Sequence, residues 1–109
     1  MKRYCYTLNL KNDKKLIKKY IEHHQNVWPE VLESFKRNGV INAEIYNVSN
    51  RLFFLIDTFD SFSDEKMKKY NLEDPIIQKW EKLMWTFQEP LPFRKKNEKW
   101  IKMNRIFKL

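Results

Sequence analysis

The order in which the hydrophobic spacing changes along the chain restricts its fold more than any other feature. Apolar residues alternate in four segments, which predicts strands over residues 3–10, 41–48, 51–59 and 100–109. Apolar residues at helical spacing lie between the first two strands and again before the last one. This β-α-β-β-α-β order predicts an α+β, ferredoxin-like fold, in which helices cover one face of a four-stranded antiparallel sheet.

Short polar residues and prolines predict where the helices begin and end. Asn12 and Asp13 can cap a helix that ends near Asn26. Pro29 disfavours helical geometry at the residue before it but suits the first turn of a new helix, so the first helical region should contain a break. The second region should contain a short helix and a longer one, with N-caps at Ser61 or Ser63 and at Asp74.

Length and composition predict one domain over residues 1–109 and a cytoplasmic location. A chain of 109 residues is a common size for one domain, and no segment is a long linker. The single cysteine, Cys5, cannot form an intrachain disulfide, which fits a reducing compartment. The N-terminus lacks a signal-type apolar run, and no stretch approaches the roughly 20 apolar residues of a membrane span, so we expect no membrane partner.

The formal charge of +8 raises the question of a nucleic-acid partner. The basic residues are spread along the chain, mixed with Asp and Glu, and are mostly Lys, whereas Arg is the residue favoured for bidentate phosphate and base contacts. Solvated helix faces explain this distribution better, and we expect no nucleic acid to bind. A basic adaptor remains the alternative, and it would show salt-dependent binding to nucleic acid.

The strand around Phe54 predicts a second copy of the chain as a partner. Residues 52–56 are apolar on both sides of the strand, but the helices cover only one face of the sheet. The other face would expose a large apolar patch in a monomer. We therefore expect a face-to-face homodimer.

The two histidines, His23 and His24, are adjacent and must point in different directions from a helix. His24 continues the inward stripe of Leu16 and Tyr20, so an imidazole and a phenol meet one turn apart. A catalytic role for His24 and a hydrogen-bonded structural role are both open on spacing alone. Trp80 could likewise stack on a sugar ring or pack in the core.

Metal and cofactor sites leave characteristic sequence motifs, and none of those motifs is present. The chain has no HExxH motif, no set of ligands at metal-binding spacing, and only one glycine, so it lacks a phosphate-binding loop and a dinucleotide fingerprint. We therefore expect neither a metal nor a cofactor.

The segment from Tyr20 to Glu30 contains Tyr, three residues, His, three residues, and then Trp-Pro-Glu. In this it resembles the L-rhamnose mutarotase family, which includes L-fucose mutarotases. The likeness continues through residues 42–46, 51–55, 78–84 and 105–109, and so covers nearly the whole chain. It implies a dimeric α/β barrel of ferredoxin-like subunits without metal or coenzyme, acting on L-rhamnose or L-fucose.

The resemblance also implies roles for single residues. His24 takes the place of the catalytic histidine, Tyr20 that of a substrate-binding tyrosine, and Trp80 that of the first of two adjacent binding tryptophans. Glu81 replaces the second tryptophan and Ala43 replaces a binding tyrosine. We therefore expect the sugar preference to differ from that of the rhamnose-specific members of the family, whereas the chemistry should be retained. Glu81 either binds sugar hydroxyls or faces solvent.

Mutarotation opens and recloses a sugar ring, so a proton must leave the anomeric hydroxyl and another must reach the ring oxygen. The pKa of histidine, ordinarily about 6.5, suits this exchange at neutral pH. We expect His24 to protonate the ring oxygen, with water, Tyr20 or Glu81 as the partner base. The alternatives are a cofactorless monooxygenase or a sugar-binding module, since the same dimeric fold also serves these functions.

Overall fold

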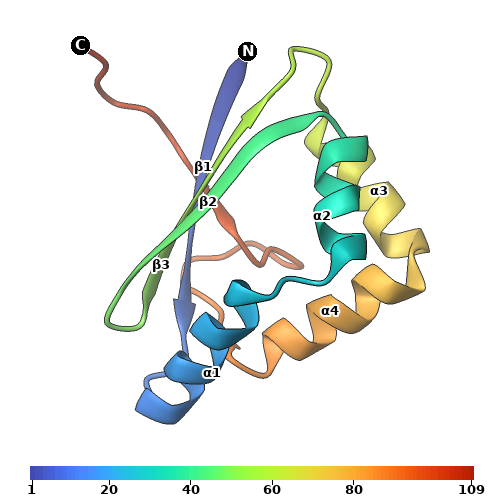
Figure 1. Ribbon diagram of the computed structural model, residues 1–109. Helices are drawn as coiled ribbons and strands as arrows, with labels where there is room; N and C mark the ends of the chain where they lie inside the picture. The colour runs from blue at the N-terminus through green and yellow to red at the C-terminus, as the bar shows by residue number, and fades with distance from the viewer.

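The computed structural model describes all 109 residues, which form five strands and four helices. The strands are β1 (Lys2–Leu10), β2 (Val40–Val48), β3 (Arg51–Thr58), β4 (Gln88–Glu89) and β5 (Ile101–Met103). The helices are α1 (Lys14–Gln25), α2 (Pro29–Arg37), α3 (Asp64–Glu73) and α4 (Pro75–Trp85). All four helices lie on one side of a single antiparallel sheet, which confirms the α+β class (Figure 1).

The sheet has the strand order β2-β3-β1, and β4 and β5 share the far edge of β1. β1 and β3 pair along almost their whole length, and β2 and β3 form the predicted hairpin through Ser49 and Asn50. Each of the two helical regions is broken into two helices. The element order is therefore the predicted one, with α1 and α2 in the first crossover and α3 and α4 in the second.

The predicted last strand over residues 100–109 is wrong in extent, and the sheet has five strands rather than four. Only β5 pairs there, opposite residues 5–7 of β1, while the short β4 pairs with Asn9 and Leu10. Residues 90–100 loop out between these two pieces. The apolar residues Ile106 and Phe107 are exposed beyond β5, because the C-terminal segment leaves the sheet and no other part of the chain covers it (Figure 1).

Local capping chemistry sets the start of each helix. The Asp13 carboxylate accepts two backbone N–H bonds in the first turn of α1. The backbone of Trp28 is extended and Pro29 begins α2, as the sequence predicts. Ser63 rather than Ser61 caps α3, and Asp74 caps α4 through two backbone N–H bonds. None of the helices combines the length and apolar composition needed to cross a membrane.

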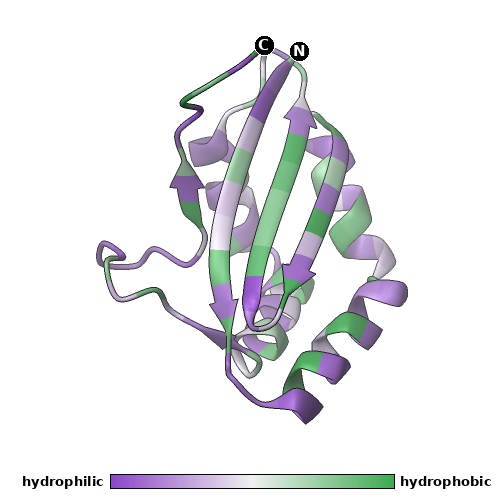
Figure 2. Ribbon diagram, turned by 90° about the vertical axis from the view of Figure 1, so that its left-hand side faces the viewer, coloured by the Kyte–Doolittle hydropathy of each residue, from purple (hydrophilic) through white to green (hydrophobic).

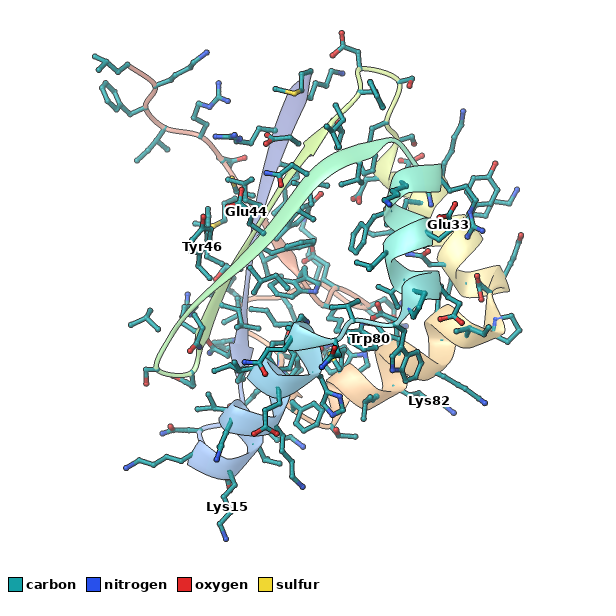
Figure 3. All side chains as sticks on the ribbon, viewed as in Figure 1. Lys15, Glu33, Glu44, Tyr46, Trp80 and Lys82 are labelled. Atoms are coloured by element: carbon teal, nitrogen blue, oxygen red, sulfur yellow. The ribbon has the colours of Figure 1, made fainter.

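The face of the sheet opposite the helices is uncovered in the single chain. Figure 2 looks onto this face, with the largely apolar β3 in the middle. Phe53 and Leu55 of β3 are half-buried there, and Tyr46 of β2 packs against Phe53 with ring centroids 6.2 Å apart. The Tyr46 hydroxyl donates to the Glu44 carboxylate, and both side chains point away from the helices (Figure 3).

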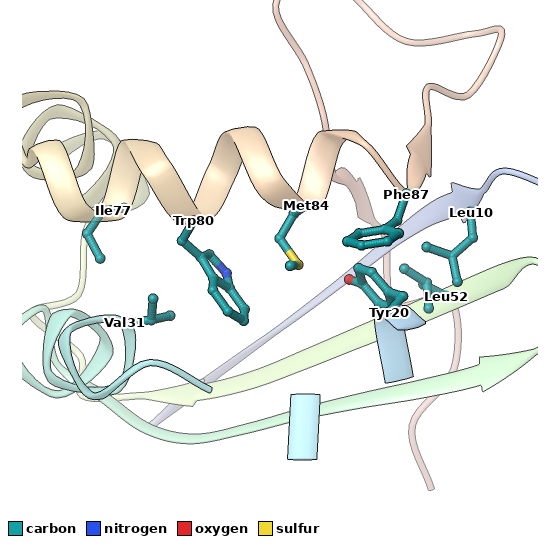
Figure 4. Close-up of a cluster of buried hydrophobic side chains, with 8 residues drawn as sticks. All are labelled: Leu10, Tyr20, Val31, Leu52, Ile77, Trp80, Met84 and Phe87. Atoms are coloured by element: carbon teal, nitrogen blue, oxygen red, sulfur yellow. The ribbon is translucent and has the colours of Figure 1, made fainter. Parts of the chain in front are cut away.

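The main core lies between the helices and the other face of the sheet. It is formed by eight buried side chains from α1, α2, α4, β1, β3 and the turn after α4: Leu10, Tyr20, Val31, Leu52, Ile77, Trp80, Met84 and Phe87 (Figure 4). Two of the residues singled out from the sequence, Tyr20 and Trp80, belong to this cluster. The core therefore holds one side of the candidate site in place.

Candidate active site

A pocket of about 310 Å³ opens between the helices and the sheet, next to the main core. Most of its lining residues are hydrophobic, and they come from all four helices, from β2 and β3, and from residues 99–100. Small-molecule sites are typically mainly apolar cavities of roughly 300–1,000 Å³ with a few placed polar groups. Nowhere in the chain do three His, Cys, Asp or Glu side chains lie close enough to hold a metal ion.

The structure brings all five residues singled out from the sequence into this pocket. They are Tyr20, His24, Ala43, Trp80 and Glu81. Tyr20 and His24 stand one turn apart on α1, with ring centroids 4.3 Å apart. Trp80 and Glu81 come from α4, and Ala43 comes from β2 on the opposite wall. The packing of α1 and α4 over the sheet brings these three separate segments together.

The hydrogen bond of His24 fixes which of its ring nitrogens can accept a proton. Nδ1 lies 2.8 Å from the backbone carbonyl oxygen of Tyr20. A carbonyl oxygen can only accept, so Nδ1 carries the hydrogen in the neutral ring and Nε2 has the free lone pair. Burial lowers the pKa of His24, the charge of His23 lowers it further, and the bond to Tyr20 partly opposes both. The ring is therefore neutral near pH 7, and Nε2 is a proton acceptor.

The Tyr20 hydroxyl keeps its proton at neutral pH, so it can donate a hydrogen bond but cannot act as a base. Its side chain is buried, and its hydroxyl oxygen accepts a hydrogen bond of 3.2 Å from Gln88 Nε2. Burial raises the pKa of Tyr20 far above its ordinary value, so the phenol keeps its proton at neutral pH. The hydroxyl accepts this bond but makes none as a donor, so its hydrogen has no partner within the protein.

Trp80 is both a core residue and part of the pocket wall. Its side chain is only 6% exposed, and its ring meets Trp28 at 5.2 Å and His24 at 5.7 Å in edge-on contacts. These contacts hold the indole beside the imidazole. Trp80 is thus a core residue, and its place in the pocket wall is compatible with the predicted role as a ligand platform, which stays a prediction.

Glu81 is paired rather than free in solvent. Its carboxylate accepts a hydrogen bond of 2.6 Å from Lys99 Nζ, a residue that the sequence did not single out. Lys99 lies near the end of the loop of residues 90–100, and Gln88, which also lines the pocket, lies just before this loop. No periodic spacing or motif marks either residue, so only the folded chain reveals them.

Comparison with characterised relatives defines the class of protein. The chain is 39% identical over 111 residues to an L-fucose mutarotase from Xanthomonas campestris pv. campestris, covering 100% of this chain and 89% of the relative. It is 32% identical over 93 residues to an L-rhamnose mutarotase from Oceanobacillus iheyensis, covering 84% and 80%. The chain is accordingly an isomerase acting on carbohydrates.

The sequence model of L-rhamnose mutarotase matches residues 3–109, and the chain belongs to the L-rhamnose mutarotase family. Its fold agrees with this assignment. A crystal structure of an L-rhamnose mutarotase from Formosa agariphila superposes with a TM-score of 0.73, covering 100% of this chain and 99% of that one at 22% identity. The family relationship supports a role in interconverting sugar anomers.

Proposed function

We propose that the protein interconverts the α and β pyranose anomers of a 6-deoxy-L-hexose, L-rhamnose or L-fucose, in the cytoplasm. The observation that supports this most directly is the environment of His24, a neutral imidazole whose Nε2 is unpaired at an aromatic-lined pocket. The higher identity to an L-fucose mutarotase makes L-fucose the first sugar to test.

The chemistry needs one proton to leave the anomeric hydroxyl and one to reach the ring oxygen. These two oxygens are bonded to the same carbon, so a single nitrogen can serve both. His24 Nε2 accepts the hydroxyl proton, the bond between C1 and the ring oxygen breaks, and the imidazolium gives the proton to the ring oxygen. The open-chain aldehyde rotates about C1–C2, and closure reverses both transfers and restores the neutral ring.

The remaining residues hold the sugar. Trp80 offers apolar aromatic surface to the pyranose, and Tyr20 donates its hydroxyl hydrogen to a sugar oxygen. Ala43 leaves space on the opposite wall, and Glu81 accepts from a hydroxyl. Of the three partner bases considered from the sequence, Tyr20 is disfavoured by its raised pKa and Glu81 by its bond to Lys99, which leaves water. The route through His24 alone needs no partner base.

Exchange NMR tests the activity directly. Anomeric magnetisation transfer should be faster with the protein than without it for L-fucose or L-rhamnose, and unchanged for a D-sugar control. Binding of the sugar with no change in exchange would instead identify a sugar-binding module. Oxygen consumption with a large aromatic substrate would identify a monooxygenase.

The pH dependence tests the order of proton transfer. If neutral His24 acts first as a base, kcat/KM should fall as the pH is lowered through the depressed pKa of His24, which lies below the ordinary value of about 6.5. The reason is that an imidazolium has no lone pair to accept the anomeric proton. Rates measured from about pH 5 to 8 check this. A rate that rises on acidification would mean that the imidazolium acts first as an acid.

We propose that a second copy of the chain covers the uncovered face of the sheet. Half-buried Phe53 and Leu55 lie at its centre, and Tyr46 and Met103 beside them are 55% and 45% exposed. The wild type should sediment as a dimer and Leu55→Glu as a folded monomer. Ile21→Glu, at an exposed site on α1, is the matched control and should remain dimeric. A wild type that is monomeric at micromolar concentration would refute the dimer.

A further inference from the structure

Lys99 enters the pocket from the loop of residues 90–100. Its Nζ lies 2.6 Å from the Glu81 carboxylate and 5.1 Å from the centroid of the Trp85 ring. Both Lys99 and Glu81 line the same pocket as His24. The loop therefore places a cation on the wall of the candidate active site, next to the helix that carries Trp80.

The ion pair is buried more deeply than a surface salt bridge. The Lys99 side chain is 14% exposed and Glu81 is 39% exposed. Burial lowers the pKa of Lys99, although the carboxylate partly offsets this. Removing an ammonium group from water is costly, and an apolar contact could hold a loop on a helix without that cost. A purely structural role explains the charged pair poorly.

The pair also has hydrogen-bonding capacity that the protein does not use. An ammonium group has three N–H donors, and the contact with Glu81 is the only hydrogen bond that Lys99 Nζ makes. The Glu81 carboxylate has no other hydrogen-bond partner either. Sugar hydroxyls both donate and accept, so two neighbouring hydroxyls could accept from Lys99 and donate to Glu81 at once.

We propose that Lys99, together with Glu81, binds two neighbouring hydroxyls of the sugar and thereby determines which sugar the enzyme prefers. This inference rests on the mutarotase function proposed above. L-Rhamnose and L-fucose differ in configuration at C2 and C4, so a fixed donor–acceptor pair fits the hydroxyls of one sugar better than those of the other. The acid–base chemistry at His24 does not depend on the pair.

The test is the kinetics of Lys99→Met, which keeps the length of the side chain but removes its donors. Lys82→Met is the matched control, since Lys82 is exposed on the same helix as Glu81 and points away from the pocket (Figure 3). Exchange NMR over a range of sugar concentrations gives KM and kcat for both sugars. Lys99→Met should raise KM for the preferred sugar by about tenfold to a hundredfold, the range for a lost charge-assisted hydrogen bond. Its kcat should stay within a few-fold of wild type, and Lys82→Met should change neither constant.

Sugar analogues identify the hydroxyls involved. Analogues of the preferred sugar that lack the hydroxyl at C2, C3 or C4 are compared in wild type and Lys99→Met. At least one analogue should bind more weakly to wild type than the parent sugar does, yet show no such penalty in Lys99→Met. If every analogue showed the same penalty in both proteins, the proposal would be overturned, because Lys99 would then contact none of these hydroxyls.

Failure of this inference is distinguishable from failure of the proposed function. If the wild type had no exchange activity on either sugar, both the proposed function and this inference would be refuted. An active wild type with unchanged KM in a folded Lys99→Met overturns the inference alone. If Lys99→Met does not fold, Glu81→Gln provides the same test, since the loss of the negative charge should also raise KM for the preferred sugar. An unchanged KM in Glu81→Gln would then overturn the proposal.

Discussion

Replacing His24 by Asn should slow anomer exchange by about 10² to 10⁴-fold, the usual contribution of a positioned general acid–base group. Asn keeps a polar side chain of similar reach on α1, but it cannot take up and release a proton. The pocket and the helix should otherwise survive, because the imidazole makes one hydrogen bond, to the backbone of its own helix. Exchange NMR measures the rate at neutral pH, and circular dichroism measures the fold.

The neighbouring histidine supplies the control for this substitution. His23 packs against Phe87 with ring centroids 5.4 Å apart and does not line the pocket. His23→Asn changes the same chemical group one position earlier, and it should retain close to the wild-type rate. Near-normal exchange in His24→Asn would remove His24 from the mechanism.

Replacing Trp80 by Ala should lower the free energy of unfolding by about 3–5 kcal/mol, the range for removing a buried aromatic side chain. The indole is 94% buried within a cluster of eight buried residues, so its loss leaves a cavity in the main core. Sugar binding should also weaken, because the same ring forms part of the pocket wall. Urea denaturation gives the stability, and exchange NMR in native buffer gives KM.

Two further variants separate the two roles of Trp80. Trp80→Phe retains much of the core volume, so it should lose less stability than Trp80→Ala while still reducing the aromatic surface beside the sugar. Trp85→Ala removes a half-buried indole from the same helix and should cost less stability. If Trp80→Ala proved no more destabilising than Trp85→Ala, Trp80 would not be an anchor of the core.

The parts of the fold that were predictable from the sequence are those set by local chemistry. Asp13, Pro29 and Asp74 each act through neighbouring backbone groups, and the helices begin where these residues predict. The divided fourth strand was not predictable. Strand periodicity shows which residues alternate but not which neighbour they pair with, so the apolar residues after Met103 gave the same signal as a paired strand.

In the candidate site, too, some features follow from local spacing in the sequence and others depend on how the elements pack. Tyr20 and His24 are one helical turn apart, so their contact follows from spacing alone. The protonation state of Tyr20 depends on how deeply the core buries it, and the engagement of Glu81 depends on a lysine 18 residues away on another segment. Such effects require the packed structure, because they arise between elements.

The two short strands beside β1 determine which part of the chain can vary without disturbing the rest of the fold. β4 and β5 each fix one end of the residue 90–100 segment to the same edge, so the stretch between them is anchored independently at both sides. Leu91 is buried and Trp100 packs against Phe54, but residues 92–97 between them are exposed. The length and composition of this exposed part should vary without shifting either register or disturbing α1, where the imidazole resides. Natural variation or laboratory grafting in this stretch therefore offers a route to new sugar preferences that leaves the proton-transfer apparatus untouched.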